Sequence, residues 1–363
     1  MKILYGVQGT GNGHISRARC IVGKLNALGA EVDFLFSGRD NKDDYFDMQE
    51  FADFKVLHGV RLCMSKGRLN ILKTISNFSF KKLKSEIKSL DLSNYDLVLT
   101  DFEPICAWAA KKQNVPCVAI GHQYSFKYDV PCEGDNFISR LIFKYYAPSD
   151  RHIGFHWSNY NAPILPPLIQ SIDQKMIESV QRTNDVLVYL AHENSQQMIV
   201  LLQKLNDIEF VYHCADIEPA QYGNVTVKEF SRDGFQKSLL KCNYIITGAG
   251  FEFPSEALQL GKSIIVKPVK GQMEQLSNAK ALTQLGFATR VDRWDVKTIR
   301  DWYETSELIK VNFPDITHDI AKWVMDPTQE SIEQISNRLW SNVVSSKIEK
   351  EETFSISEML SLA

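Results

Sequence analysis

The residues best suited to chemistry in this chain lie between Tyr244 and Ala279. A brief apolar run ending at Thr247 predicts a buried strand, which leads through a glycine turn into the start of a helix. The turn consists of Gly248, Ala249, Gly250 and Phe251. Glycines let the backbone come close to a ligand, and the free N–H groups at a helix N-terminus attract a phosphate. Glu256 follows one turn into the helix, where its carboxylate can accept hydrogen bonds from a sugar diol.

A second set of polar side chains follows the next predicted strand, 263–267. Glu274 and Gln275 place hydrogen-bond acceptors and donors side by side, which suits the recognition of hydroxyl groups. Asn278 follows three residues later. Any one of these residues is better explained as part of a solvated turn or an exposed helix start. The whole set in this order favours a ligand-binding site.

The N-terminus carries another glycine loop, directly after a predicted strand at 2–7. The loop contains Gly9, Gly11, Asn12, Gly13 and His14, and apolar residues at helical spacing follow it. Imidazole side chains titrate near neutral pH, so His14 could take a proton from an incoming hydroxyl group. The alternative is that His14 is a solvated residue at a helix start.

Asp101 is the candidate partner of His14. The predicted strand 97–100 runs into Asp101, and the carboxyl ends of neighbouring parallel strands face the same crevice. A carboxylate there would fix the tautomer of the imidazole. By itself, Asp101 is better explained as the cap of the following helix. His122 follows the predicted strand 117–120 in a similar way, and it could line an acceptor pocket or be purely structural.

A glycine loop after a first strand is also typical of dinucleotide-binding domains. Those domains place an acidic residue at the end of the second strand to bind the ribose diol, whereas this chain has Ser37, Gly38 and Arg39 there. The pattern argues against NAD. Ser37 and Arg39 would suit the additional phosphate of NADP, so an NADP-dependent oxidoreductase stays open as an alternative.

Residues 66–88 form a basic amphipathic stretch. They contain seven lysines and arginines and one glutamate, with apolar residues interleaved among the charges. Such a stretch could lie on an anionic membrane surface or bind a phosphorylated acceptor. An ordinary helix with one solvent-exposed face has the same pattern. The apolar and aromatic segment 137–146 admits the same two interpretations.

Composition and length set the frame for these motifs. A chain of 363 residues exceeds what one core usually supports, which predicts two domains. With 44% hydrophobic and 23% charged residues it is typical of soluble globular proteins, and a net charge of -3 gives no reason to expect a nucleic-acid partner. Seven cysteines without paired spacing, no signal peptide and no membrane-spanning apolar run lead us to expect a cytoplasmic protein.

A proline-rich segment divides the chain. Residues 159–168 contain three prolines and no periodicity, which predicts a stiff linker between a first domain, 1–158, and a second domain, 169–343. Alternating strands and helices are predicted on both sides of the linker, so both domains are expected to be α/β and Rossmann-like. The polar tail, 344–363, is predicted to be loosely held and could pack back on the first domain.

These motifs resemble those of nucleotide-sugar glycosyltransferases of the GT-B fold, in particular the MurG-type enzymes of family 28 and the UDP-glycosyltransferase superfamily. The resemblance spans nearly the whole chain and is strongest where Glu256 follows Gly250 by six residues and Gln275 precedes Asn278. It implies two Rossmann-like domains that face each other across a cleft. Further residues are similar to a branch of bacterial and archaeal glycosyltransferases: Phe155, His156, Trp157, Pro166 and Pro167.

The resemblance also implies roles for the site residues. Glu256 would bind the ribose hydroxyls of UDP, and Glu274 and Gln275 would hold the transferred sugar. His14 would be the base that activates the acceptor, supported by Asp101. The partners would be a UDP-sugar and a small-molecule, glycan or lipid-linked acceptor, with no cofactor and no metal. Such an enzyme of the cell envelope would act in the cytoplasm or at the inner face of the membrane.

Two positions depart from the family pattern. Where relatives often have a phosphate-binding histidine or arginine, two residues before Gly250, this chain has Gly248. The loop after the predicted strand 186–190 carries Glu193, which is unfavourable beside a diphosphate unless it contacts a cation. UDP-sugar epimerases share this fold, and a nucleotide-sugar-binding protein that has lost catalysis would keep the same motifs, so both alternatives stay open.

Overall fold

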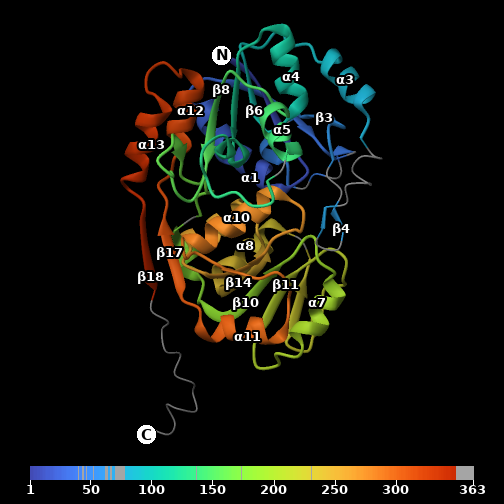
Figure 1. Ribbon diagram of the computed structural model, residues 1–363, viewed down its shortest axis with the longest axis vertical. Helices are drawn as coiled ribbons and strands as arrows, with labels where there is room; N and C mark the ends of the chain where they lie inside the picture. Colours follow the sequence, from blue (N-terminus) through green and yellow to red (C-terminus); the bar gives the residue numbers. More distant parts are fainter. Residues whose placement is uncertain are drawn as a thin grey trace.

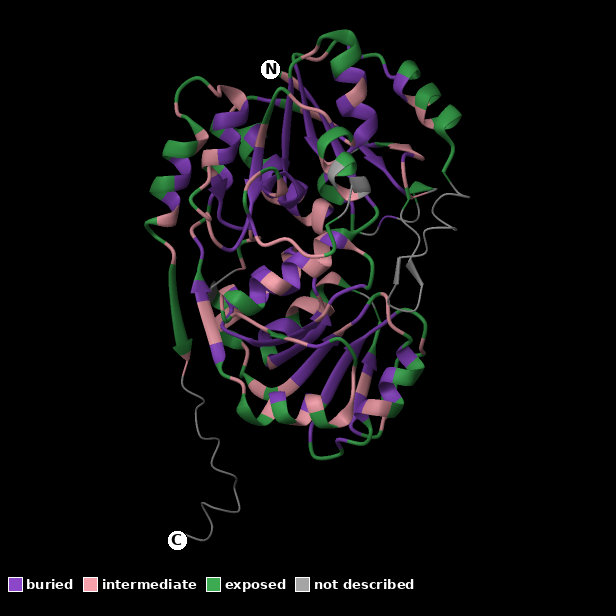
Figure 2. Cartoon of the chain, viewed as in Figure 1, coloured by how far each residue is buried: buried purple, intermediate pink, exposed green. Residues whose placement is uncertain are grey.

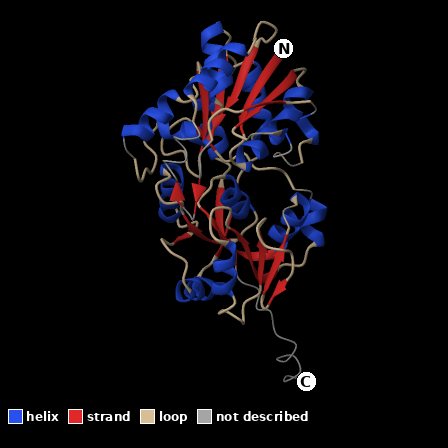
Figure 3. Cartoon of the chain, turned by 90° about the vertical axis from the view of Figure 1, so that its right-hand side faces the viewer, coloured by secondary structure: helices blue, strands red, loops and turns tan. Residues whose placement is uncertain are grey.

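The chain folds into two halves, each built on a seven-stranded sheet, which lie one above the other in the computed structural model (Figure 1). The structure describes residues 1–39, 41–42, 45, 47–51, 53–61, 64–65, 68–69, 78–135, 137–172, 174–229 and 231–348. Helices flank the strands in both halves, as the view turned by 90° shows (Figure 3). The strands are buried over most of their length, which makes the two sheets the centres of the halves (Figure 2).

The first sheet has the strand order β3-β2-β1-β6-β7-β8-β9, and all its neighbouring strands are parallel. Its strands are β1 (Lys2–Gln8), β2 (Glu31–Ser37), β3 (Lys55–Leu57), β6 (Leu97–Asp101), β7 (Cys117–Gly121), β8 (Arg151–Phe155) and β9 (Ile164–Leu165). β1 and β6 are neighbours, with Val7 opposite Asp101. The loops that follow these two strands therefore meet at one edge of the sheet.

The helices of the first half connect these strands. They are α1 (Asn12–Ala27), α3 (Phe80–Ser89), α4 (Pro104–Gln113) and α5 (Phe137–Tyr145), with the short 3-10 helices η2 (Gln49–Phe51) and η3 (His122–Lys127) and a small hairpin of β4 (Met64–Ser65) and β5 (Arg68–Leu69). α4 is capped by Glu103, whose carboxylate accepts hydrogen bonds from the N–H groups of Ile105 and Cys106. The cap of this helix is therefore Glu103, and the carboxylate of Asp101 is left for another partner.

The second sheet has the order β12-β13-β11-β10-β14-β15-β16 and is parallel except for the β12–β13 pair at its edge. Its strands are β10 (Thr183–Tyr189), β11 (Phe210–His213), β12 (Gln221–Tyr222), β13 (Val225–Lys228), β14 (Cys242–Gly248), β15 (Ser263–Lys267) and β16 (Thr289–Arg290). The accompanying helices are α6 (Gln174–Ser179), α7 (Ser195–Leu202), α8 (Arg232–Lys241), α9 (Glu252–Gln259), α10 (Met273–Gln284) and α11 (Val296–Thr305). The glycine turn after β14 thus leads directly into α9.

Part of the segment predicted as a linker is a strand. β9 pairs with β8 at the edge of the first sheet, and His156 donates its backbone N–H to the carbonyl of Leu165 at 3.0 Å. The prolines of this segment flank β9. Proline is tolerated at a sheet edge because no further strand there needs its missing N–H group.

The chain returns to the first half before its end. α12 (Thr317–Met325) packs against α1, and α13 (Ile332–Trp340) packs against β9, where Ser336 Oγ and Trp340 Nε1 each donate to the carbonyl of Ile164 at 2.7 Å. β18 (Val344–Ile348) then pairs antiparallel with β17 (Leu308–Asn312), which contacts α9. The described part of the predicted tail, 344–348, thus pairs with β17, whereas the contacts with the first half are made by α12 and α13, which the sequence analysis assigned to the second domain. Residues 349–363 lie outside the described part.

One apolar core connects the halves. It extends from β1 and α1 of the first half to β14 and α9 of the second. At the contact, the rings of Trp157 and Phe251 have their centroids 4.8 Å apart, and Trp157 Nε1 donates to Ser255 Oγ at 2.8 Å. The far face of each sheet has an apolar cluster of its own. The two halves are therefore joined by a shared apolar core, and each half has a further cluster of its own.

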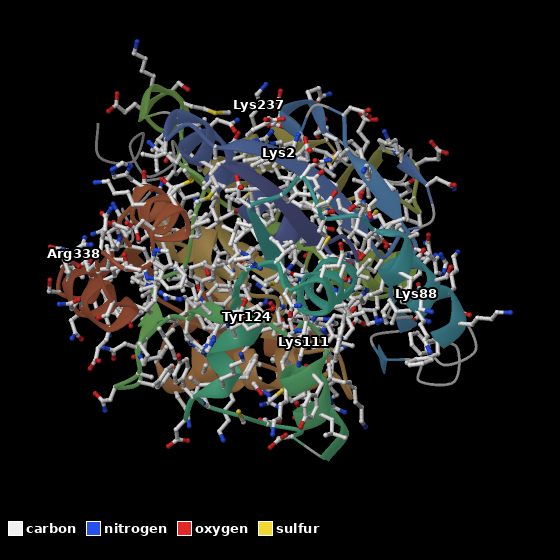
Figure 4. The ribbon with its side chains drawn as sticks, turned by 90° about the horizontal axis from the view of Figure 1, so that it is seen from above. Lys2, Lys88, Lys111, Tyr124, Lys237 and Arg338 are labelled. Atoms are coloured by element: carbon white, nitrogen blue, oxygen red, sulfur yellow. The ribbon has the colours of Figure 1, made fainter. Side chains whose placement is uncertain are left out.

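The basic stretch 66–88 is described only in part, because residues 66–67 and 70–77 lie outside the described residues. In α3, Ile87 is buried in the core shared with α4, whereas the lysines of the helix are exposed. Lys88 lies at the outer edge of the molecule seen from above, away from Tyr124 near its middle (Figure 4). None of the helices in the described ranges is long and apolar enough to cross a bilayer.

Candidate active site

His14 and Asp101 are in contact at the carboxyl edge of the first sheet. α1 begins just after the glycine loop that follows β1, and the neighbouring strand β6 ends at Asp101. Nδ1 of His14 lies 2.7 Å from Oδ1 of Asp101. The carboxylate is fully buried, and the His14 side chain is 14% exposed. The structure thus brings together the imidazole and the carboxylate that the strand order predicted as partners.

Arg17, one turn after His14 on α1, binds the same carboxylate. Its Nε donates to Oδ2 of Asp101 at 2.6 Å, and its Nη2 donates to Oδ1 at 3.0 Å. The remaining Nη1 donates to the carboxylate of Glu252, the first residue of α9 in the second half. Arg17 itself is buried. A chain of four side chains, His14, Asp101, Arg17 and Glu252, therefore joins the two halves.

The charges around Asp101 keep its carboxyl group ionised, which favours one tautomer of the neutral His14 imidazole. Burial alone would raise the pKa of Asp101, but the charges of Arg17 and His14 outweigh it and hold that pKa below its ordinary value. When the imidazole is neutral, the ionised carboxylate can accept its Nδ1–H, and the lone pair is then on Nε2. This is the tautomer that a general base needs, with its free nitrogen on the side of the ring away from Asp101.

The glycine loop contacts both halves. The N–H of Gly9 donates to the carbonyl at the end of β2 at 2.6 Å, and Gly11 is the exposed N-cap of α1. Gly13 touches the second half, since a Cβ atom at this position would lie 2.9 Å from Cγ of Glu252. Asn12 accepts a hydrogen bond from the guanidinium group of Arg39, two residues after β2. A larger residue at 13 would therefore push α9 away from α1.

The second glycine turn connects β14 to α9. Gly250 has open space where a Cβ atom would be, whereas Ala249 and Phe251 are buried. Glu256 lies one turn after Glu252 and is partly buried. Among the residues that the structure describes, its carboxylate has no hydrogen-bond or ion-pair partner. The start of α9 therefore carries two carboxylates on one face, of which only Glu252 is paired.

Both carboxyl groups of α9 are hard to ionise. Burial raises the pKa of Glu252 to about 7, although the charge of Arg17 opposes the rise. Burial also raises the pKa of Glu256 to about 7, and the neighbouring charge of Glu252 adds to the rise. Ionising both Glu252 and Glu256 therefore lowers the stability of the folded protein.

The polar residues at the start of α10 have different surroundings. Glu274 accepts a hydrogen bond from Nε2 of Gln123 in the first half at 3.1 Å. Gln275 accepts one from the backbone N–H of Val269 at 2.9 Å. Asn278 is fully buried, and its Nδ2 donates to the carbonyl in the β14–α9 turn at 3.1 Å. Glu274 therefore faces the first half, whereas Gln275 and Asn278 brace the neighbouring turns.

His122 is enclosed by the contact between the halves. Its Nδ1 lies 2.8 Å from the carbonyl oxygen of Phe155, and its Nε2 lies 2.6 Å from Oδ1 of Asn278. The ring stacks on Phe251 with centroids 4.0 Å apart, and burial lowers the pKa of the imidazole. Because both ring nitrogens are engaged, the structure gives His122 a bridging position instead of the open acceptor-pocket position considered from the sequence.

Glu193 does contact a cation. Its carboxylate accepts a hydrogen bond from Nζ of Lys267, the last residue of β15, at 2.5 Å. β10 and β15 flank β14, so this ion pair lies beside the strand that ends at Gly248. The negative charge that made the loop after β10 unfavourable for a diphosphate is therefore neutralised.

Comparison with known protein families identifies this arrangement. Residues 1–305 match the family model named glycosyl transferase family 1. The chain belongs to this family. Among curated proteins, this glycosyltransferase is 24% identical over 336 residues to an uncharacterized glycosyltransferase of Methanosarcina mazei, a match that covers 80% of this chain and 86% of the relative.

Solved glycosyltransferase structures share the fold. The glycotransferase of kitacinnamycin is similar with a TM-score of 0.59 and 12% identity, over 94% of this chain and 99% of that one. Arabidopsis thaliana UGT89C1, complexed with UDP, is similar with a TM-score of 0.57 and 14% identity, over 94% of this chain and 98% of that one. Acinetobacter baumannii MurG is similar with a TM-score of 0.54 and 12% identity, over 94% of this chain and 99% of that one. These matches confirm the predicted GT-B fold of two Rossmann-like halves.

The family decides against the oxidoreductase alternative, and the structure gives a local reason. Ser37 is fully buried and donates to the carboxylate of Glu103 at 2.8 Å. Arg39 donates from Nε to the carbonyl of Gly9 at 2.6 Å. Both side chains that would suit the phosphate of NADP are thus engaged within the first half.

Within the described ranges, this glycosyltransferase holds no group of three or more His, Cys, Asp and Glu side chains placed to share a metal ion. Catalysis without a metal stays a prediction. Three residues that the sequence analysis did not single out complete the site: Arg17, Glu252 and Gln123. The three-residue spacing of His14 and Arg17, which puts both on one face of α1, was the one local signal for Arg17.

We expect the Glu256→Gln variant to be more stable than the wild type at alkaline pH. The pKa of Glu256 is raised to about 7 in the folded protein, so its ionisation costs more there than in the unfolded chain. The free energy of unfolding of the wild type therefore falls as the pH rises from the unfolded pKa to about 7. Removing the charge should raise the Tm by roughly 1–3 °C at pH 8, and the two Tm values should converge near about pH 4. Scanning calorimetry at both pH values measures this. Glu333→Gln, at an exposed glutamate of α13, is the matched control; an unchanged Tm for Glu256→Gln at pH 8 would contradict the expectation.

Proposed function

We propose that this glycosyltransferase moves a hexose-type sugar from a UDP-sugar to an acceptor hydroxyl group, with His14 as the base. The observation that supports the proposal best is the pairing of His14 with a buried, ionised Asp101 at the edge of the first half that touches α9. The pairing leaves Nε2 able to take a proton. A purely structural histidine would not need that free nitrogen.

The donor is proposed to bind the second half. The diphosphate would lie at the turn from Gly248 to Phe251, where the N–H groups at the start of α9 supply hydrogen bonds, and the ribose would lie on Glu256. Support comes from the carboxylate of Glu256, which has no partner among the described residues, and from the open space at Gly250. Arg17 neutralises Glu252 next to this turn, which lessens its repulsion of a phosphate.

The reaction is proposed to be a single inverting displacement. His14 Nε2 takes the proton of the acceptor hydroxyl as its oxygen attacks the anomeric carbon. The bond between that carbon and the departing phosphate oxygen breaks, and both bonding electrons leave with UDP. The N–H groups at the start of α9 would stabilise the charge that develops on UDP, so the proposed mechanism needs no metal.

The acceptor is proposed to be a small molecule, a glycan or a lipid-linked compound that enters from the first half. Lipid linkage would agree with peripheral membrane contact through residues 66–88. In the described part of that stretch, Phe78 and Phe80 are 40% and 70% exposed, next to the exposed lysines of α3. Basic and aromatic side chains together are typical of a surface that contacts anionic lipid.

Calorimetric titration with UDP, UDP-glucose, UDP-galactose, UDP-N-acetylglucosamine and NADPH tests the donor. We expect UDP and at least one UDP-sugar to bind, and NADPH not to bind. Glu256→Gln should weaken UDP binding about tenfold or more, since a charged hydrogen-bond acceptor is lost. Failure of every uridine nucleotide to bind would refute the proposed donor.

Product analysis separates the remaining alternatives. A transferase releases UDP in amounts equal to the glycosylated acceptor. A UDP-sugar epimerase would release UDP without an acceptor and would yield an isomerised sugar. A nucleotide-sugar-binding protein without catalysis would bind UDP and release nothing from any donor. Mass spectrometry of reactions with and without an acceptor extract distinguishes the three.

A further inference from the structure

Gln123 carries a buried hydrogen-bond acceptor at the contact between the halves. The residue lies in η3, just after β7, and is 5% exposed. Its Nε2 donates to Oε1 of Glu274 across the contact between the halves. Its Oε1 is buried and has no hydrogen-bond partner among the residues that the structure describes. Buried carbonyl oxygens are nearly always hydrogen-bonded, so this atom calls for a donor from outside the chain.

The free oxygen lies next to the proposed catalytic pair. A Cβ atom on Gly121 would lie 3.1 Å from Oε1 of Gln123 and 3.2 Å from Oδ1 of Asp101. Gly121 has φ +149°, a conformation that favours glycine, and a side chain at this position would crowd both oxygens. Gln123 therefore hydrogen-bonds Glu274 and lies near the carboxylate oxygen that His14 contacts.

We propose that Gln123 binds a hydroxyl group of the transferred sugar, beside Glu274. The inference rests on the proposed function. It means that residues of both halves form the donor site. A hydroxyl can donate to Oε1 of Gln123, and a neighbouring hydroxyl can donate to the carboxylate of Glu274, so the pair suits a vicinal diol. Gln123 is then a positioning and specificity residue that favours hydroxylated hexoses over deoxy sugars.

A structural role for Gln123 predicts something different. If its hydrogen bond to Glu274 only holds the halves together, its loss should weaken every ligand that binds between them, including UDP. If Oε1 binds the sugar, its loss should affect the sugar and spare the nucleotide. The difference between UDP and UDP-hexose binding therefore separates the two roles.

The test uses Gln123→Met, which keeps the length of the side chain and removes both polar atoms. Gln203→Met, at an exposed glutamine at the end of α7, is the matched control. The dissociation constants for UDP, UDP-glucose, UDP-galactose and UDP-N-acetylglucosamine are measured by calorimetry. For the hexose that binds best, analogues lacking one hydroxyl at a time are measured with both the wild type and the variant.

We expect Gln123→Met to bind UDP within about twofold of the wild type and the UDP-hexose about 5- to 10-fold more weakly. With the wild type, one deoxy analogue should bind more weakly than the full UDP-hexose by the same factor. With the variant, that analogue and the full UDP-hexose should bind equally, because the mutation and the missing hydroxyl remove one shared contact. Gln203→Met should match the wild type throughout.

Other results overturn the inference. Equal weakening of UDP and UDP-hexose would show that Gln123 only joins the halves. Unchanged hexose affinity, or a wild type to which no hexose adds affinity beyond UDP, would show that Oε1 binds no sugar hydroxyl. If the wild type binds no UDP at all, the proposed donor is wrong and this inference is wrong with it. That outcome is distinguishable from the others, because in all of them the wild type binds UDP.

Discussion

The His14→Ala variant is expected to lose sugar transfer almost completely while it still binds UDP. Removing a general base costs roughly 10²- to 10⁴-fold in rate. The imidazole belongs to the first half, with its Nδ1 on Asp101, whereas the proposed UDP contacts all lie in the second half. We therefore expect the kcat of transfer to fall by at least about a hundredfold, and the dissociation constant of UDP to change by less than about twofold.

Transfer is measured as UDP release in the presence of an acceptor extract, and UDP binding by calorimetry on the same preparations. His318→Ala, which removes an exposed histidine of α12, is the control and should leave both quantities unchanged. A parallel loss of binding and transfer in His14→Ala would mean that the residue shapes the site without acting as its base. Retained transfer would mean that another group takes the proton.

The positions of His14 and Asp101 could be predicted because both depend on local patterns. The apolar runs of β1 and β6 and the glycine loop after β1 are visible in the sequence, and parallel strands bring their carboxyl ends together. The same holds for the turn after β14 and for the fold class. These features need only the order of strands and helices along the chain.

The contacts between the halves could not be predicted in this way. Arg17 and Glu252 are far apart in the sequence, and each has an ordinary local explanation, since α1 is amphipathic and acidic residues are common in the first turn of a helix. Their pairing depends on how one sheet is oriented on the other. The enclosed position of His122, which stacks on Phe251, has the same origin.

The course of the chain after β17 was also beyond local patterns. α12 and α13 have the periodicity of amphipathic helices, but periodicity does not say which half receives the apolar face. The hydrogen bonds of Ser336 and Trp340 to the carbonyl of Ile164 decide it, and they exist because β9 forms an edge strand in a segment whose prolines predicted a linker.

The Arg17→Met variant is expected to be strongly destabilised in a pH-dependent way. Arg17 neutralises two carboxylates in the contact between the halves, those of Asp101 and Glu252. Without it, both are left in buried surroundings with one cation fewer, and breaking a buried pair in this way costs about 3–5 kcal/mol. The Tm should fall accordingly. Arg293→Met, at an arginine whose side chain is 88% exposed, should change it little.

The dependence on pH gives the sharper test. Because the pKa of Asp101 is held below its ordinary value, its pairing stabilises the fold above that ordinary value and is lost as the pH falls through the lowered pKa. The Tm gap between wild type and Arg17→Met should therefore be widest near pH 8 and narrow toward about pH 4, where the carboxyls of the variant become protonated. Adding Glu252→Gln to Arg17→Met should recover part of the gap at pH 8, since one unpaired charge disappears. A gap that is constant from pH 4 to pH 8 would mean that Arg17 contributes packing rather than charge, and the electrostatic link between His14 and α9 would have to be abandoned.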